Sequence, residues 1–154
     1  MKVNREYPAT PLVGVGGVVI DSTGRALVVR RATEPLKGRW SIPGGLVDLG
    51  ETLQEAVERE IAEETGLTVK AEAVIEVLDR IYREAERVRY HYVLVDYLCT
   101  LVSGHAQASS DADEVRWITR DEWLGANPHN LEPLAREIIE KGWQMSRTAV
   151  GDAS

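Results

Sequence analysis

Apolar side chains recur with a helical period between Thr52 and Gly66. At about 100° per residue, one arc of the helical wheel is apolar and consists of Leu53, Ala56, Val57 and Ile61. Thr52 and Glu55 have the Thr-x-x-Glu spacing of a capping box, and Gly66 stands where a left-handed glycine ends a helix. The pattern predicts an amphipathic helix over residues 53–65.

Three carboxylates interrupt the expected separation of charge from this apolar arc. Glu60 and Glu64 fall within the arc and Glu63 falls at its edge. A solvated helix places its charges on the opposite face, and like charges four residues apart repel. The alternative is a solvated acidic face with Arg59 as the local partner. The wheel favours a site that holds a hard divalent cation.

The segments before this helix have the pattern of strands and a loop. Residues 12–20 and 26–31 are apolar runs joined by an Asp-Ser-Thr-Gly turn, which predicts a β-hairpin. Residues 33–45 contain two prolines and three glycines, too many for regular structure, so a loop is expected. Residues 46–51 then lead into the helix. The first run also resembles the apolar part of a signal peptide, but no small-residue cleavage site follows it, and a strand is the preferred interpretation.

After the helix come two long β-prone runs, residues 69–83 and 88–102, around a charged turn. These runs predict a pair of long strands. Residues 103–113 are small and polar, which predicts a loop, and residues 114–119 predict a short strand. The single cysteine, Cys99, lies in an apolar run, so a buried thiol and a reducing, cytoplasmic environment are expected.

The last third of the chain predicts helices. A helical turn is expected from Asp121, and residues 130–144 have apolar positions at helical spacing, with Asn130 as N-cap. Residues 146–154 are expected to fray. Together the elements predict an α/β (α+β) fold with a mixed β-sheet between helices. Residues 1–154 are expected to form a single domain with a core over about residues 12–143.

Composition limits the possible partners. The chain has 154 residues, of which 44% are hydrophobic and 28% charged, enough for a sizeable core. A formal net charge of −7 and a pI near 5.0 argue against broad binding to nucleic acid or anionic membranes. No stretch is long enough to span a membrane as a helix. A nucleotide remains compatible with this charge if a metal ion joins it to the protein, and a homodimer with a second copy of the chain is a possible assembly.

The acidic helix also carries a recognisable motif. Gly45, then five residues, Glu51, then seven residues and the sequence Arg-Glu-Ile-Ala-Glu-Glu-Thr-Gly-Leu over residues 59–67 resembles the Nudix box. The match fills nine positions within 23 residues. The preceding loop at residues 38–45 and the later segment 114–117 also resemble those of this family. The resemblance implies a hydrolase of nucleoside diphosphates linked to another group, with the box as loop, helix and loop.

The resemblance assigns the acidic side chains to a metal site. It implies that Glu60, Glu63 and Glu64 hold one or more Mg²⁺ ions, for which Mn²⁺ is an alternative. Further oxygen donors are expected from Glu51 and from the main-chain carbonyl of Gly44 or Gly45. Arg59 is expected to orient a glutamate, although a surface ion pair would also account for it.

The general base and the substrate contacts are less narrowly defined by the sequence. Some family members use a glutamate of the box helix, here Glu60 or Glu63, which is the preferred assignment. Others use an acidic residue on a late loop, which leaves Asp111, Asp113 and Glu114 as alternatives for the base or a further ligand. Three arginines are candidates for contacts with substrate phosphates, with solvated surface as the alternative for each: Arg30, Arg31 and Arg39.

The expected reaction is Mg²⁺-dependent cleavage of a diphosphate linkage. The whole chain resembles bacterial Nudix proteins labelled ADP-ribose pyrophosphatases, which places ADP-ribose or a related nucleoside diphosphate sugar first. Nucleoside triphosphates, oxidised nucleotides and dinucleoside polyphosphates are alternatives. A non-catalytic domain that only binds a nucleotide is the competing class of function. The intact box argues against it, because a binding module has no need to keep three mutually repelling glutamates.

Overall fold

The computed structural model describes residues 4–106, 112–126 and 129–152. The predicted acidic helix is confirmed as α1, Leu53–Thr65. The backbone N–H of Glu55 donates to Thr52 Oγ1 at 3.1 Å, which is the Thr52 half of the expected capping box. Gly66 ends the helix with φ 77°, in the left-handed conformation that favours glycine.

In the described part of the chain, seven strands form two sheets. Their bounds are β1 Leu12–Val19, β2 Ala26–Arg31, β3 Trp40–Ser41, β4 Gly44–Leu46, β5 Thr68–Glu84, β6 Arg87–Ser103 and β7 Ala112–Ile118. One sheet has the order β4-β1-β6-β5 and the other the order β3-β2-β7. Strand β1 runs parallel to β6, and the other pairs are antiparallel. The four-stranded sheet is therefore mixed, as predicted.

The expected hairpin of residues 12–20 and 26–31 is wrong. The tight turn exists, because the Asp21 N–H donates to the carbonyl of Arg25 at 2.8 Å, and a single bridge joins Ile20 to Ala26. Beyond that bridge the strands separate, since β1 pairs with β4 and β6 whereas β2 pairs with β3 and β7. Both edges of each strand are thus occupied by strands other than the predicted hairpin partner.

Two predicted loops also contain strand structure. The loop expected over residues 33–45 includes β3 and the start of β4, because main-chain pairing with β2 and β1 compensates for its prolines and glycines. The loop expected over residues 103–113 is shorter, because β7 already begins at Ala112. The long strand pair is confirmed as β5 and β6, which meet at the Glu84–Arg87 pair.

The two C-terminal helices are α2, Arg120–Leu124, and α3, Pro133–Asp152. Asn130 is not the N-cap, since it lies outside α3 with φ 50°. Glu132 takes that role, because its carboxylate accepts from the backbone N–H groups of Leu134 and Ala135 at 3.2 and 3.0 Å. The predicted fraying from residue 146 is wrong as well, as α3 continues to Asp152.

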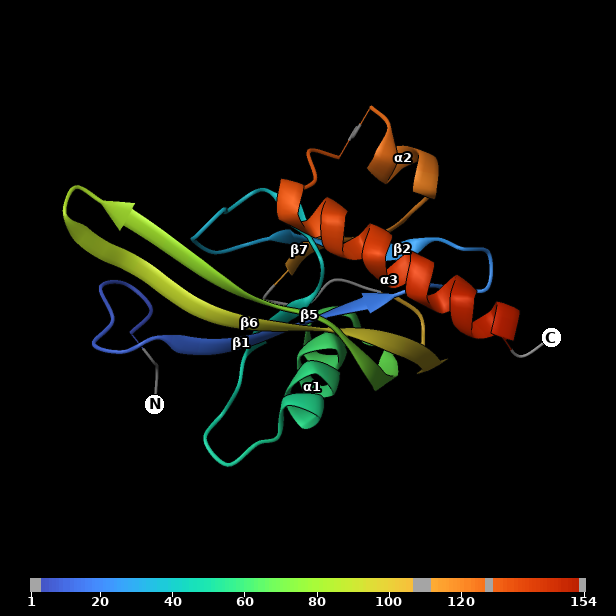
Figure 1. The fold of residues 1–154 in the computed structure, drawn as a ribbon, viewed down its shortest axis with the longest axis horizontal. Helices are drawn as coiled ribbons and strands as arrows, with labels where there is room; N and C mark the ends of the chain where they lie inside the picture. The colour runs from blue at the N-terminus through green and yellow to red at the C-terminus, as the bar shows by residue number, and fades with distance from the viewer. Residues whose placement is uncertain (1–3, 107–111, 127–128, 153–154) are drawn as a thin grey trace.

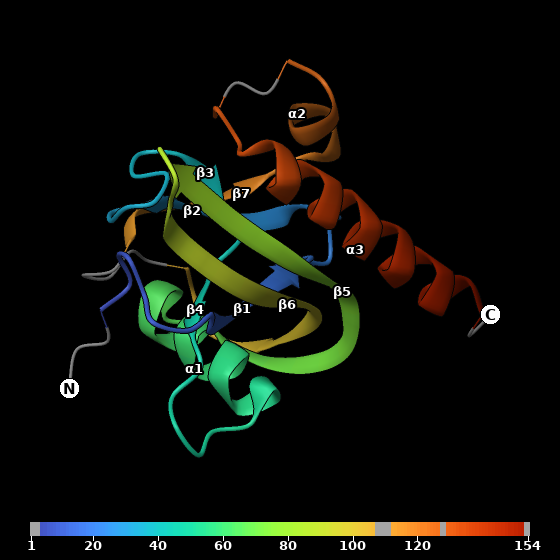
Figure 2. The same cartoon turned by 60° about the vertical axis from the view of Figure 1, so that its left-hand side comes forward.

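The helices cover opposite sides of the strands, which confirms the predicted sandwich (Figures 1 and 2). Along β1, Val15 and Val19 pack in the cluster that contains α1, and Val18 packs in the cluster that contains α2 and α3. Alternation of side chains along each strand produces the two clusters. Cys99 is buried in the α1 cluster, and burial raises the pKa of its thiol to about 12.

Candidate active site

Arg59 lies at the centre of the acidic side chains of the box. Its Nε and Nη2 donate to the two oxygens of Glu51 at 2.6 and 2.9 Å, a bidentate pair. Its Nη1 donates to Glu60 Oε1 at 2.8 Å and to Glu63 Oε2 at 3.1 Å. Nη2 also donates to the carbonyl of Leu46 at 3.1 Å. One guanidinium thus joins the loop before α1 to two glutamates of the helix.

The bidentate contact has a strong effect on Glu51. Hydrogen bonds from the Arg59 guanidinium, together with one from the Asp48 backbone N–H, lower the pKa of Glu51 to about 2. The carboxylates in turn raise the pKa of Arg59. A fourth acid, Asp48, has Oδ2 at 3.4 Å from Arg59 Nη2. Glu51 is therefore ionised throughout the physiological pH range, with its orientation defined by Arg59.

The glycines before the helix allow two glutamates to lie against the main chain. A Cβ placed on Gly45 would lie 2.3 Å from Cδ of Glu60, so a side chain at position 45 would displace that carboxylate. Glu64 is only 6% exposed, and its Oε1 accepts from the Gly44 N–H at 3.2 Å. Glu63 is half exposed. The structure thus brings seven of the predicted site residues together around β4 and α1: Gly44, Gly45, Glu51, Arg59, Glu60, Glu63 and Glu64.

The donor set of this cluster has the chemistry of a magnesium site. Carboxylate and carbonyl oxygens are the hard ligands that Mg²⁺ takes, together with waters and substrate phosphates. As placed, no three acidic, histidine or cysteine side chains among the described residues converge as ligands of one ion. The contacts of Arg59 explain this, because the guanidinium holds Glu51, Glu60 and Glu63 around itself.

The arginines expected at substrate phosphates have different surroundings. Arg31 donates from Nε to the carbonyl of Pro35 at 2.7 Å, and burial lowers its pKa while the charge of Glu64 raises it. Arg31 therefore lies beside the acidic cluster. Arg30 pairs with Glu114 at 3.3 Å across β2 and β7. Arg39 donates to the carbonyl of Asn130 at 3.3 Å, toward the loop before α3, and no contact with the box is found for it within the described residues.

The remaining candidates for a base or ligand lie on or before β7. Glu114 is on β7 and is occupied by Arg30 and by Arg116, the latter at 3.1 Å. Asp113 is on the same strand rather than in the expected loop. Asp111 lies outside the described residues. Glu114 is thus held by arginines of β2 and β7, whereas Glu60 and Glu63 are held by Arg59 of α1.

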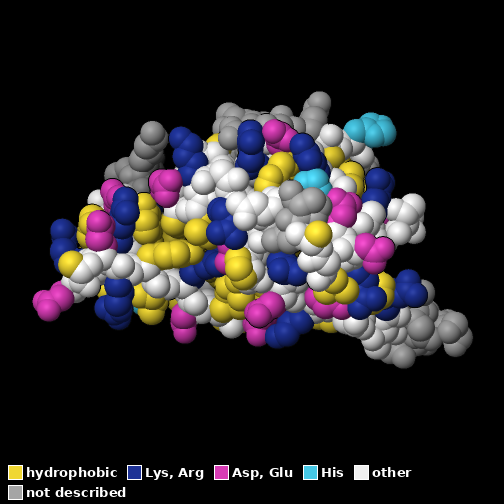
Figure 3. Space-filling model, turned by 90° about the horizontal axis from the view of Figure 1, so that it is seen from above, with side chains coloured by type: hydrophobic (Ala, Val, Ile, Leu, Met, Phe, Trp, Pro, Cys, Tyr) yellow, Lys and Arg dark blue, Asp and Glu magenta, His cyan; other side chains and the backbone are white. Residues whose placement is uncertain are grey.

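Arg31 also connects the box to an aromatic cleft at the β5–β6 hairpin. Tyr82 and Tyr90 face each other edge to face at 6.0 Å, and Tyr90 stacks on Tyr92 at 6.3 Å. With Leu36, Tyr82 and Tyr90 line a cleft of about 360 Å³. Seen from above, the half of the molecule where this hairpin projects carries a group of hydrophobic side chains among charged ones (Figure 3). Glu34, Arg83, Glu84 and Arg89 also line it, so the cleft combines aromatic and charged side chains.

Sequence reasoning missed Asp96, a carboxylate on β6 that is 5% exposed. It lies opposite Gly16 of β1 and Glu76 of β5 in the mixed sheet. Burial raises its pKa to about 7. A signal was present in the sequence, since Asp96 is the single charged residue in the apolar run of residues 93–99.

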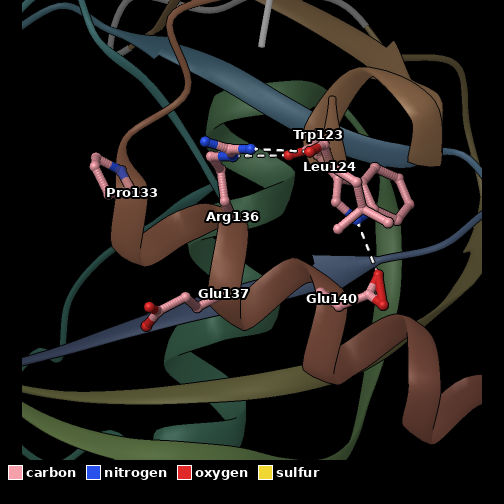
Figure 4. Close-up of a pocket in the computed structure, with 6 residues that line it drawn as sticks. All are labelled: Trp123, Leu124, Pro133, Arg136, Glu137 and Glu140. Atoms are coloured by element: carbon pink, nitrogen blue, oxygen red, sulfur yellow. Dashed lines mark hydrogen bonds between the residues drawn. The ribbon is translucent and has the colours of Figure 1, made fainter. Parts of the chain in front are cut away.

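A second hollow lies away from all of these groups, between α2 and α3 (Figure 4). It measures about 490 Å³ and is lined by side chains of both helices. Arg136 donates to the carbonyls of Trp123 and Leu124 at 2.7 and 3.2 Å, and Trp123 Nε1 donates to Glu140 at 3.1 Å. These bonds join the two helices. The hollow contains none of the residues that the sequence singled out.

The sequence matches the NUDIX domain family over residues 10–142, which includes the box and the sheets that support it. The chain belongs to the NUDIX family. This confirms the family inferred from the box, and enzymes of the family generally use divalent metal ions. None of the helices in the described part of the chain is long and apolar enough to cross a membrane.

NUDIX relatives and solved structures are similar over most of the chain. An ADP-ribose pyrophosphatase from Methanocaldococcus jannaschii is 36% identical over 107 residues, which make up 70% of this chain and 61% of that protein. A MutT-like protein from Streptomyces ambofaciens is 36% identical over 124 residues, 79% of this chain and 74% of that one. The crystal structure of a MutT NUDIX hydrolase from Burkholderia pseudomallei has a TM-score of 0.70 at 30% identity and covers 86% of this chain and 98% of its own. The fold prediction is thereby confirmed.

Proposed function

We propose that this protein is a Mg²⁺-dependent pyrophosphohydrolase that cleaves a diphosphate linkage in a nucleoside diphosphate derivative. The observation that carries the proposal is the cluster of Glu51, Glu60 and Glu63 around Arg59, with Glu64 buried beside it. Such a concentration of carboxylates in a nucleotide-hydrolase family fits metal-assisted phosphoryl chemistry. Mn²⁺ is the alternative ion.

The roles of the residues follow from the charges of the reaction. Glu60, Glu63 and Glu64 would hold the ion, with Glu51 and the carbonyls of Gly44 or Gly45 as further donors. Bound there, Mg²⁺ would neutralise the diphosphate oxygens and favour ionisation of water.

Side chains of the protein accept the proton of the attacking water and orient the glutamates. Glu60 or Glu63 takes the proton of the attacking water as general base, because both lie on α1 with a carboxylate oxygen held by Arg59. Arg59 is a positioning residue, since its contacts orient these glutamates. Arg31 interacts electrostatically with Glu64, and its Nε donates to the carbonyl of Pro35 at the cleft, so it would contact a substrate phosphate. Arg30 and Arg39 are weaker candidates, because Arg30 pairs with Glu114 and Arg39 donates to the carbonyl of Asn130.

We place ADP-ribose, or a similar nucleoside diphosphate sugar, first among substrates, with AMP and a sugar phosphate as products. The name of the relative from M. jannaschii supports this choice. That alignment spans 61% of the relative's length. The choice of substrate therefore remains a proposal that the following measurement tests. The measurement is kcat/KM for ADP-ribose, dGTP, 8-oxo-dGTP and a diadenosine polyphosphate with Mg²⁺. A tenfold preference for a triphosphate, about 1.4 kcal/mol of transition-state stabilisation, would reverse the order.

The metal site is tested by Glu64→Gln and Glu63→Gln. Each amide keeps the shape of the side chain but loses its charge, so we expect most turnover to be lost and calorimetric Mg²⁺ affinity to fall. The matched control is Glu55→Gln, the same change at an exposed position of α1. Circular dichroism checks that all three variants fold. Unchanged Mg²⁺ binding in the first two variants would refute the assignment.

The non-catalytic alternative predicts a different pattern. A nucleotide-binding module would bind ADP-ribose in calorimetry but release no AMP from any nucleotide of the panel with Mg²⁺. Hydrolysis that depends on Glu63 and Glu64 would exclude that class. The cytoplasmic location expected from the single buried cysteine, Cys99, stays a prediction.

A further inference from the structure

Strand β5 forms an edge of the mixed sheet, since β6 is its single neighbour in the sheet order of the described residues. The β5–β6 hairpin extends away from the body of the molecule (Figures 1 and 2). From Glu76 to Tyr82 each β5 residue has a β6 partner in unbroken register. The sequence of this part contains no proline. Bulges and prolines are common devices that prevent edge strands from pairing with another chain. Neither occurs between Glu76 and Tyr82, although register shifts lie on both sides of this part of β5.

Apolar side chains are exposed on one face of this edge. Val77 is 59% exposed and Ile81 is 43% exposed. Both share a face with Val13 of β1, which is 42% exposed, because Val77 pairs with Val95, Ile81 with His91 and Val13 with Val93. Exposed β-branched side chains at a regular strand edge favour pairing of that edge with another strand over its remaining exposed to water.

Charges along the edge select the register of such a pairing. Asp79 is exposed on the same face as Ile81, and Arg83 is exposed two residues beyond Ile81, past a register shift between Tyr82 and Arg83. No ion pair is found for either side chain within the described residues. In an antiparallel two-fold pairing centred on Ile81, Asp79 lies opposite Arg83 of the partner subunit and Ile81 lies opposite its own copy. A centre at Asp79 would place two carboxylates together, and a centre at Arg80 would place two guanidinium groups together. Opposite charges across strands stabilise a pair, whereas like charges destabilise it.

We propose that the β5 edge is the interface of a homodimer, in which two copies pair antiparallel about Ile81 and join their four-stranded sheets into one continuous sheet. The occupant is a second copy because the charge order along β5 is complementary to itself. This surface is separate from the acidic cluster of α1, so the proposal is independent of the catalytic assignment. An edge pairing of this length is small beside a standard interface of about 1,600 Å², and we expect a dimer that dissociates at micromolar concentration.

The test is sedimentation velocity over a range of micromolar concentrations. The wild type is expected to shift from the 17.1 kDa of one chain to twice that mass as concentration rises. Asp79→Arg or Arg83→Asp alone should raise the dissociation constant at least about tenfold, because each places like charges across the two-fold axis. The double variant D79R/R83D restores opposite charges and should dimerise like the wild type. Glu137→Arg, an equal change of charge on an exposed position of α3, is the control.

Rescue by the double variant is the decisive result, because a general effect of surface charge would not be reversed by a second substitution. Hydrogen exchange of the wild type gives a second measurement that needs no variant. Amides of residues 77–84 should be more protected at high than at low protein concentration. A wild type that remains at 17.1 kDa throughout, or a dimer unaffected by either single substitution, would overturn the proposal.

Discussion

Asp96 gives a prediction about stability that follows directly from its surroundings. Its carboxylate lies against Gly16, where a Cβ would come within 2.5 Å of Oδ1. Its pKa is raised to about 7, mainly by desolvation, which Arg80 opposes and to which the charges of Glu76 and Glu132 add. Arg80 is itself paired with Glu132. Asp96 is therefore a buried acid whose positive neighbour is shared with another carboxylate.

A raised pKa means that the folded state holds its proton more tightly than the unfolded state. The contribution of Asp96 to stability is then largest at low pH and falls as pH rises from the unfolded pKa of 3.8 through the folded pKa of about 7. The full difference corresponds to about 4 kcal/mol at 1.36 kcal/mol per pH unit, an upper bound. Between about pH 5 and about pH 8, linkage gives a loss of about 2.5 kcal/mol from this residue.

The perturbation is Asp96→Asn, which resembles the protonated acid in shape but does not ionise. We expect the free energy of unfolding of the variant to exceed that of the wild type at both pH values, by about 2.5 kcal/mol more near pH 8 than near pH 5. Urea denaturation followed by circular dichroism at both pH values measures it. Asp121→Asn, at an exposed position of α2, controls for the general effect of removing a carboxylate. Equal losses of stability with pH in the wild type and the Asp96 variant would refute the reasoning.

Two further predictions concern the box. Gly45→Ala should lower kcat at least about tenfold while the protein remains folded, because the added Cβ would occupy the position of the Glu60 carboxylate. Steady-state kinetics measure the effect, and an unchanged kcat would contradict the prediction. Thr52→Ala should destabilise the protein by about 1 kcal/mol through loss of the cap on α1, with little change in kcat per folded molecule. A urea midpoint equal to that of the wild type would show that the cap contributes nothing.

The success of sequence reasoning depended on how local each feature is. The bounds of α1 were predicted because Thr52 and Gly66 act on adjacent turns of the helix. The long strands were predicted because β5 and β6 are joined by a short turn. The division of β1 and β2 between two sheets was missed, since it depends on pairing between β1 and the distant β6. Local patterns do not contain such long-range partners.

The candidate site divides in the same way. The box identified the acidic residues, but their arrangement around Arg59 depends on the loop that brings Glu51 to the helix. Asn130 was a reasonable N-cap by residue type, yet Glu132 caps α3 because its carboxylate reaches two backbone N–H groups and also pairs with Arg80. That ion pair comes from β5, on a distant part of the chain. Tertiary contacts therefore decided which of two polar residues became the cap.

The charge balance at the box links the structure to the proposed chemistry. Arg59 supplies one positive charge to four carboxylates, those of Asp48, Glu51, Glu60 and Glu63. Because three of these side chains lie within about 3 Å of the guanidinium, its charge orients them but does not balance them. A diphosphate substrate adds further negative charge, so its approach requires additional cations. Arg31 supplies one beside Glu64. A divalent ion held by glutamates of α1 would supply the rest, and for this reason we assign orientation to Arg59 and charge neutralisation to the metal.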